Sequence, residues 1–233
     1  MYILVFVIVL ITVLYRLTEK MKEVFTPNVR FYTRQETEEF LIADEDGYVD
    51  SLTPMDLNKR NVQSKDDYIE NIKESAKDFT DFEKKIIEES VIEAQEYLEE
   101  LESVFIETEL ISSLNWNFSI TENGQYEMGL PHTRSDVIFL TSEVIRNEKF
   151  VNTLIHEKIH VYQRVHKNLF QEALRKNGYE VIGRRDERKD LRSNPDLDEF
   201  MYMKHDKIYV GKGRDEHPNE EIAYNLEKFV YIE

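Results

Sequence analysis

The chain of 233 residues contains no cysteine. Disulfide bridges, iron–sulfur clusters and thiol nucleophiles are therefore excluded, and any bound metal must be held by histidines and carboxylates. Glycine and proline are scarce, with 7 and 5 residues, which excludes collagen-like and low-complexity sequences. Positive charge is also in deficit, since the formal net charge is −17. Because contacts with phosphate groups need a basic surface, no nucleic-acid partner is expected.

An uncharged apolar run occupies residues 2–15, and Arg16 follows it directly. Residues 1–17 just reach the lower length limit of a membrane-spanning helix, so we predict an N-terminal transmembrane helix that anchors the protein in a membrane. A cleaved signal peptide and a buried strand or helix are the alternatives. Basic residues flank only the C-terminal side of the run, which places the large C-terminal domain of this single-pass protein in the cytosol.

Two regions are expected after the anchor. Residues 18–64 are polar and rich in turn-forming residues, which predicts an irregular stalk with short strands around 29–32. A domain over residues 65–233 follows, and its first part, 65–110, has a helical pattern in which apolar residues recur every three or four positions. One face of this helical part is expected to pack on the core through Ile87, Val91, Ala94, Leu98, Leu101 and Phe105.

Charge is unevenly distributed along the chain. Between Glu36 and Glu109, 24 Asp and Glu residues stand against 7 Lys and Arg residues, which accounts for the whole net charge. The segment 156–192 has the opposite balance, with 10 Lys and Arg residues against 6 Asp and Glu residues. The acidic helix over residues 83–105 is therefore either a solvated face or an interaction surface, for example against this basic segment.

Strands and helices alternate in the rest of the chain. Residues 115–121 alternate in polarity and residues 137–140 form a short apolar run, so both segments are predicted as strands. Residues 149–174 follow a helical pattern, and residues 200–210 alternate again, which predicts a strand or a hairpin. A second helix is expected to begin near Pro218 and to run to about residue 231.

The helix over residues 149–174 carries His156-Glu157-Lys158-Ile159-His160, an HExxH motif. Residues four apart on a helix share a face one turn from each other, so both imidazoles can bind one metal ion. Glu157 is rotated by about 100° from His156, which places it near a metal-bound water without making it a ligand. Zinc lowers the pKa of such a water, and a neighbouring carboxylate takes its proton. The motif therefore predicts a Zn²⁺ site with His156 and His160 as ligands and Glu157 as the catalytic residue.

A third metal ligand must come from elsewhere in the chain. His166 has the spacing of the third histidine of the metzincins, HExxHxxxxxH. Gln163, however, occupies the position at which that family has the glycine that breaks the helix. On an unbroken helix His166 points about 80° away from His156 and cannot reach the same ion. A metzincin site is therefore not expected.

The segment Asn219-Glu220-Glu221-Ile222-Ala223 fits the Asn-Glu-x-x-Ser/Ala pattern of the gluzincins. These are HExxH metallopeptidases whose third zinc ligand is a glutamate on a later helix, and the chain resembles them over residues 137–232. The resemblance implies that Glu220 is the third ligand, although Glu221 beside it is chemically identical. Tyr224 departs from the family, in which several members have an acidic residue that holds a zinc histidine. The phrase HEKIHVYQR also resembles zincin-like proteins of large DNA viruses.

The resemblance implies an α+β, zincin-like fold for the domain, with a catalytic core over residues 111–233. The HExxH helix would pack beneath a small sheet whose edge strand, over residues 137–141, pairs with an extended peptide substrate. A C-terminal helix would carry Glu220. Further candidates for stabilising the transition state are His132, Arg134, His205 and Tyr224.

Together these features predict a membrane-anchored zinc metallopeptidase that hydrolyses bonds in a peptide or protein substrate. One alternative is a non-catalytic membrane or virion protein whose zincin-like metal site is structural or vestigial, with His217 as a fourth ligand. The other alternative is an interaction module that acts through the acidic helix over residues 83–105, with incidental histidines.

Overall fold

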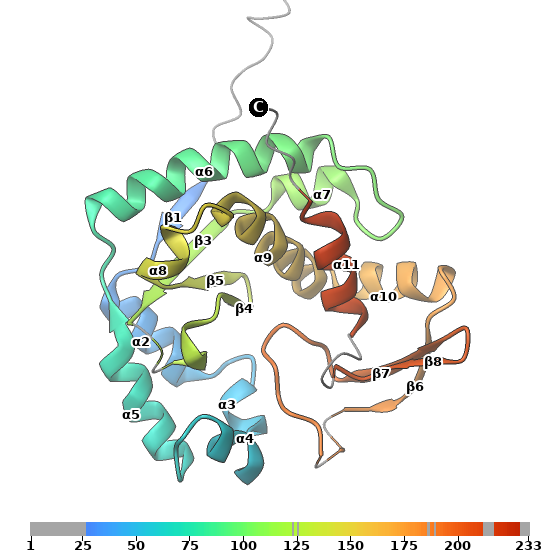
Figure 1. Ribbon diagram of the computed structural model, residues 1–233, viewed down its shortest axis with the longest axis horizontal. Helices are drawn as coiled ribbons and strands as arrows, with labels where there is room; N and C mark the ends of the chain where they lie inside the picture. Colours follow the sequence, from blue (N-terminus) through green and yellow to red (C-terminus); the bar gives the residue numbers. More distant parts are fainter. Residues whose placement is uncertain are drawn as a thin grey trace, which may run out of the picture.

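The computed structural model describes residues 27–122, 124, 126–185, 187–188, 190–211 and 217–228. These residues form an α+β fold with helices around two small sheets, as the sequence predicts (Figure 1). The predicted membrane anchor over residues 1–17 lies outside the described residues. Within the described ranges, no helix is both long enough and apolar enough to cross a membrane.

The larger sheet contains, in spatial order, β1 (Val29–Phe31), β3 (Trp116–Thr121), β5 (Val137–Leu140) and β4 (His132–Arg134), and β2 (Ala76–Lys77) pairs with the end of β3. β1, β3 and β5 are parallel, whereas β4 runs antiparallel to β5. Both strands predicted for this region are confirmed. The expectation that residues 137–141 form the edge is wrong, because β4 covers that side of β5. Every residue of β5 is buried, which is typical of an interior strand.

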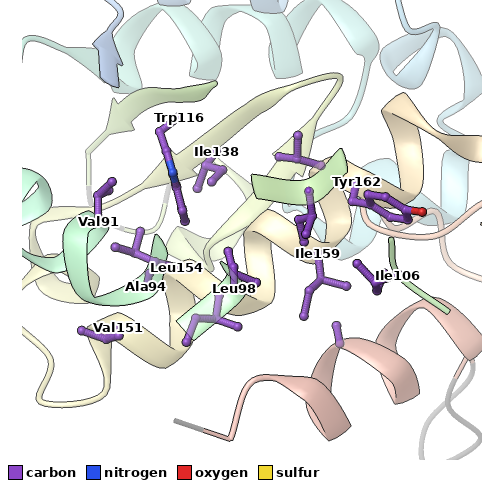
Figure 2. Close-up of a cluster of buried hydrophobic side chains, with 14 of the residues drawn as sticks. Val91, Ala94, Leu98, Ile106, Trp116, Ile138, Val151, Leu154, Ile159 and Tyr162 are labelled. Carbon is purple, nitrogen blue, oxygen red and sulfur yellow. The ribbon is translucent and has the colours of Figure 1, made fainter. Parts of the chain in front are cut away.

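The main hydrophobic core lies between the larger sheet, α6 (Asp81–Glu99) and α9 (Phe150–Val165). Figure 2 shows side chains of the two helices and of the sheet pointing toward one another. The predicted apolar face of α6 is confirmed, because it buries Ile87, Val91, Ala94 and Leu98. The HExxH helix, α9, is therefore held between the sheet and α6 by its own apolar side.

We expect Leu98→Ala to lower the free energy of unfolding by about 2–5 kcal/mol, because the change leaves a cavity in this core. Leu98 is 0% exposed, whereas Ile92 on the same helix is 49% exposed. Ile92→Ala is therefore the control, with an expected change below about 1 kcal/mol. Urea denaturation measures both values, and equal losses in the two variants would contradict the packing of α6 on the core.

The prediction of an irregular stalk over residues 18–64 is wrong from residue 27 onward. The predicted strand around 29–32 is confirmed as β1, but three helices follow it: α2 (Arg34–Ala43), α3 (Tyr48–Ser51) and α4 (Pro54–Lys59). Such short helices contain too few turns to produce a readable apolar period. Their tertiary packing is nevertheless extensive, since together with the sheet they form a second core cluster that includes Leu41, Tyr48, Val49, Leu52, Leu57, Tyr126, Val137 and Phe139.

The C-terminal part of the chain begins with the HExxH helix and ends with a helix that packs against it. The helix predicted over 149–174 is divided at His166 into α9 and α10 (Lys167–Lys176). A three-stranded antiparallel sheet follows, of β6 (Glu180–Arg184), β7 (Phe200–Lys204) and β8 (Lys207–Tyr209), which confirms the predicted hairpin over 200–210. α11 (Pro218–Leu226) then packs beside α9 (Figure 1). The other helices are α5 (Lys65–Ser75), α7 (Thr108–Ser113), α8 (Ser142–Ile145) and the 3-10 turn Glu127–Gly129.

Candidate metal centre

The two histidines of the HExxH motif and Glu220 meet at one point. His156 and His160 lie one turn apart on α9, and Glu220 reaches them from the first turn of α11. The Nε2 atoms of the histidines are 3.0 Å apart, and Oε2 of Glu220 lies 3.4 Å from the first and 3.6 Å from the second. Ligand atoms bound to a tetrahedral zinc ion at its usual distances are about 3.3 Å from one another. The three side chains therefore fit a single tetrahedral ion.

Each histidine is held through its outer ring nitrogen. Nδ1 of His156 lies 2.6 Å from Oε2 of Glu227, and Nδ1 of His160 lies 2.8 Å from Oε1 of Gln163. Gln163 in turn donates from Nε2 to the backbone oxygen of Asn219, at 3.0 Å. Because carboxylate and amide oxygens accept these hydrogen bonds, the neutral form of each ring keeps its proton on Nδ1, and its Nε2 lone pair then faces the shared point. This tautomer is the one that binds a metal through Nε2.

The supporting roles of Glu227 and Gln163 were not predicted from the sequence. Glu227 provides the acidic support that Tyr224 lacks, and the ring of Tyr224 instead packs 4.7 Å from that of His156. Helical spacing was the one sequence feature that could have indicated these roles. Glu227 follows Glu220 by seven residues and Gln163 follows His160 by three, so each shares a helix face with a metal ligand. Spacing alone does not show which face of α11 turns toward α9, so these roles needed the tertiary structure.

Glu157 lies beside the centre and is buried. The hydroxyl of Thr133, on the edge strand β4, donates to Oε2 of Glu157 at 3.0 Å. Burial, together with the negative charge of Asp196, raises the pKa of Glu157 to about 7. A carboxyl group with this pKa can both accept and return a proton near neutral pH.

Several carboxylates surround the two histidines of the metal centre. Although burial lowers the pKa of His156, its contacts with Glu220 and Glu227 raise that pKa to about 10. The contacts with the histidines likewise hold the pKa of Glu220 well below its usual range, despite burial. Glu157 and Asp196 add further negative charge nearby. A divalent cation would compensate this surplus and would take the place of the protons on the imidazoles.

A cavity of about 1080 Å³ opens at the centre. His156, Glu157 and Glu220 lie in its wall, and so do Pro131 and His132 at the start of the edge strand β4. A cavity of this size accommodates a small molecule or a short peptide segment. The metal centre is therefore accessible to a substrate.

The other predicted ligands point elsewhere. Glu221 accepts a hydrogen bond from the hydroxyl of Tyr179 at 3.0 Å, so the structure brings Glu220 and not Glu221 to the histidines. His217 contacts the backbone oxygen of Phe200 through Nε2, at 3.0 Å, and accepts a hydrogen bond at the start of α11 through Nδ1. His166 marks the end of α9, where its ring packs against that of Tyr162.

The four candidates for transition-state stabilisation divide into two pairs. His132 and Tyr224 line the cavity at the metal centre. Arg134 is buried in β4, where it forms ion pairs with Asp44 and Asp46 that fasten the N-terminal helices to the sheet. His205 lies in the exposed turn between β7 and β8. His132 donates from Nδ1 to the backbone oxygen of Leu130 at 2.9 Å, and burial lowers its pKa and so favours the neutral ring, which has no second N–H. Only Tyr224 therefore remains a candidate.

We expect Glu227→Ala to weaken zinc binding by about 10–100-fold, because His156 loses the acceptor that fixes its tautomer and ring orientation. Glu221→Ala is the matched control, since it removes a carboxylate from the same helix without touching either histidine. Competition with a chromogenic chelator measures both affinities. Equal affinities of the Glu227→Ala variant and the wild type would contradict the orienting role of Glu227.

Comparison of the chain with protein-family models, with curated proteins and with solved structures gave no match. The functional inference therefore depends on the geometry and chemistry of the centre itself.

Proposed function

We propose that the protein is a zinc-dependent peptidase with a zincin-like catalytic domain. The observation that supports this proposal is the convergence of His156, His160 and Glu220 on one point, with Glu157 beside them in the wall of a large cavity. Two imidazoles and one carboxylate suit zinc better than magnesium or calcium, which prefer oxygen ligands. Three protein ligands also leave one position of a tetrahedral ion open, as catalytic zinc sites require.

Each residue of the centre has a distinct role in the proposed reaction. A zinc ion bound here would polarise the substrate carbonyl and lower the pKa of the attacking water. Glu157 accepts the proton of that water and delivers it to the leaving amine, while Thr133 holds its carboxylate in place. Tyr224 lines the cavity, and its hydroxyl would donate a hydrogen bond to the carbonyl oxygen.

We infer that the substrate is an extended peptide. Among the described residues, β4 pairs with one strand, β5. On its other edge the backbone N–H of Thr133 donates to Oδ1 of Asp196 at 2.7 Å, and an incoming peptide would take the place of that contact. The residues at the start of β4, Pro131 and His132, lie in the wall of the cavity at the metal centre. A free strand edge binds an extended chain through backbone hydrogen bonds. A peptide bound in this way would cross the centre within reach of Glu157.

Incubation of the zinc-loaded protein with a mixed peptide library tests the proposal, with new N-termini identified by mass spectrometry. We expect cleavage that stops when a chelator removes the zinc and returns when zinc is restored. Bound zinc without any cleavage would favour the alternative of a non-catalytic protein with a structural or vestigial site.

Membrane anchorage through residues 1–17, with the C-terminal domain in the cytosol, is a further part of the proposal. It is supported by the apolar run and by the basic residues that follow it. In sealed vesicles with their cytosolic face outward, added protease is expected to digest the domain. Digestion only after the vesicles are opened would contradict this orientation.

A further inference from the structure

A second cavity, of about 360 Å³, is separated from the cavity at the metal centre by the loop over residues 192–197. Its wall includes Arg164 at the end of α9, Gln171 on α10 and Arg185 just after β6. Residues 192–197 line both this cavity and the larger one. Gln163 and Asn219, which support His160, also lie in its wall. The second cavity is therefore next to the metal centre, on the far side of the loop over residues 192–197.

Two buried N–H donors in this wall have no acceptor. Nε of Arg164 and Nε2 of Gln171 are buried and make no hydrogen bond within the described part of the chain. A buried donor without an acceptor costs about 1–3 kcal/mol, and more when the group is charged. Arg164 also forms no ion pair with a described residue, and burial lowers the pKa of its guanidinium. The protein thus maintains an unpaired cation and an unpaired amide at one cavity.

Arg185 is also buried in this wall without a carboxylate partner among the described residues. Backbone oxygens fix its orientation instead, through a hydrogen bond of 2.7 Å from Nε to Val210 and one of 3.1 Å from Nη2 to Arg192. Carbonyl oxygens hold a guanidinium without neutralising it. Arg185 therefore adds a second positive charge that forms no ion pair with a carboxylate of the described chain, although Asp198 and Asp56 act on it from a longer distance.

Four carboxylates line the same wall, and three of them are engaged with a cation, a hydroxyl or an imidazole. Asp46 is paired with Arg134, and Glu199 with Lys167 at 2.7 Å. Asp198 accepts a hydrogen bond of 2.6 Å from the hydroxyl of Tyr202 and lies 3.2 Å from Nε2 of His217. The fourth, Asp196, accepts a hydrogen bond from the backbone N–H of Thr133 at 2.7 Å, and its negative charge raises the pKa of Arg164, although no ion pair joins the two side chains. The wall therefore presents two guanidinium groups without an ion pair and two buried N–H groups without an acceptor, which is the complement of an oxyanion.

We propose that the cavity lined by Arg164, Gln171 and Arg185 binds a small oxyanion, namely the phosphate or carboxylate group of a metabolite. The volume of about 360 Å³ exceeds that of the anionic group alone, so the ligand carries further atoms. Bound there, it supplies the acceptors that Arg164 and Gln171 lack. It also touches the wall formed by Gln163 and Asn219, behind His160.

Thermal denaturation of the metal-free full-length protein tests this site, with inorganic phosphate and succinate as separate probes and sodium chloride of equal ionic strength as the reference. Removal of the metal makes the result independent of the proposed peptidase activity. We expect at least one probe to raise Tm by about 5–10 °C when its concentration is about a hundredfold above Kd. The probe that acts distinguishes phosphate from carboxylate recognition. No rise above the salt reference with either probe would overturn the proposal.

Arg164→Met is the decisive variant, and Arg175→Met on the exposed side of α10 is its matched control. We expect the anion response to be lost in the first variant and retained in the second. Without anion, Arg164→Met is expected to melt at or above the wild-type Tm, because an unpaired buried charge becomes an apolar side chain of similar length. A clearly lower Tm, or an anion response equal to that of the wild type, would contradict the proposal.

Gln171→Leu provides an independent variant that keeps both arginines. We expect the phosphate or succinate concentration at half-saturation to rise about tenfold, because one hydrogen bond to a charged ligand is lost. An unchanged half-saturation concentration would show that Gln171 does not contact the anion. The anion would then not bind in this cavity, and the proposal would be overturned.

Discussion

Replacement of Glu157 by glutamine is expected to reduce kcat for peptide hydrolysis by about 10²–10⁴-fold while one zinc ion per chain is retained. Glutamine has nearly the same shape as glutamate and can still accept the hydrogen bond from Thr133. It cannot, however, take a proton from water near neutral pH. The variant therefore separates proton transfer from metal binding, since Glu157 is not among the three converging ligand residues.

Steady-state kinetics on a peptide found by the library screen, together with zinc analysis of the same samples, measures this effect. Glu143→Gln is the control, because it removes one exposed carboxylate near the start of α8 and leaves the centre intact. Full activity of Glu157→Gln would exclude the proposed mechanism. Loss of zinc in this variant would instead place Glu157 in the ligand set.

Replacement of Glu220 by alanine is expected to weaken zinc binding by more than about 100-fold, because the metal would lose a negative charge and the one carboxylate among the three converging ligands of the described residues. The adjacent Glu221→Ala variant is the control with the same change of charge and helix propensity. Glu221 is bound to the hydroxyl of Tyr179, away from the histidines, so its removal should leave zinc affinity within about threefold of the wild-type value.

Metal content after dialysis and a competition titration give the two affinities. Tight binding in Glu220→Ala with loss in Glu221→Ala would reverse the assignment of the third ligand. No zinc in the wild-type protein, even after zinc is supplied, would leave the HExxH motif without a metal. The acidic helix and the N-terminal apolar run would then be the places to search for function.

Residue spacing predicts that the two histidines share a metal ion, but it does not predict which groups orient their rings. The four-residue interval between His156 and His160 is a local property of any helix, so the sequence indicates that both rings can reach one ion. The groups that select their tautomers come from different places. Gln163 lies on the same helix, whereas Glu227 directly follows α11, and more than fifty residues separate α11 from α9 in the chain.

The N-terminal region shows where sequence patterns are least informative. α2, α3 and α4 contain 10, 4 and 6 residues, so each has room for only one or two core residues. The region therefore looks polar overall. Thr33 and Thr53 begin α2 and α4 with capping boxes, and these are the local signals that point to helices here. The buried pairs of Arg134 with Asp44 and Asp46 connect sites about ninety residues apart and have no local signature.

The sequence by itself determined the features that depend on neighbouring residues: the HExxH helix, the apolar face of α6, the strands over 116–121 and 137–140, and the helix that starts at Pro218. Short-range periodicity and capping encode these directly. Only the tertiary structure decided that Glu220 rather than Glu221 faces the histidines, that β4 forms the sheet edge, and that Nε of Arg164 is buried without an acceptor among the described residues. Adjacent helical residues point about 100° apart, so the docking angle of α11 selects between the two glutamates. That angle follows from packing across the whole core, which no local pattern contains.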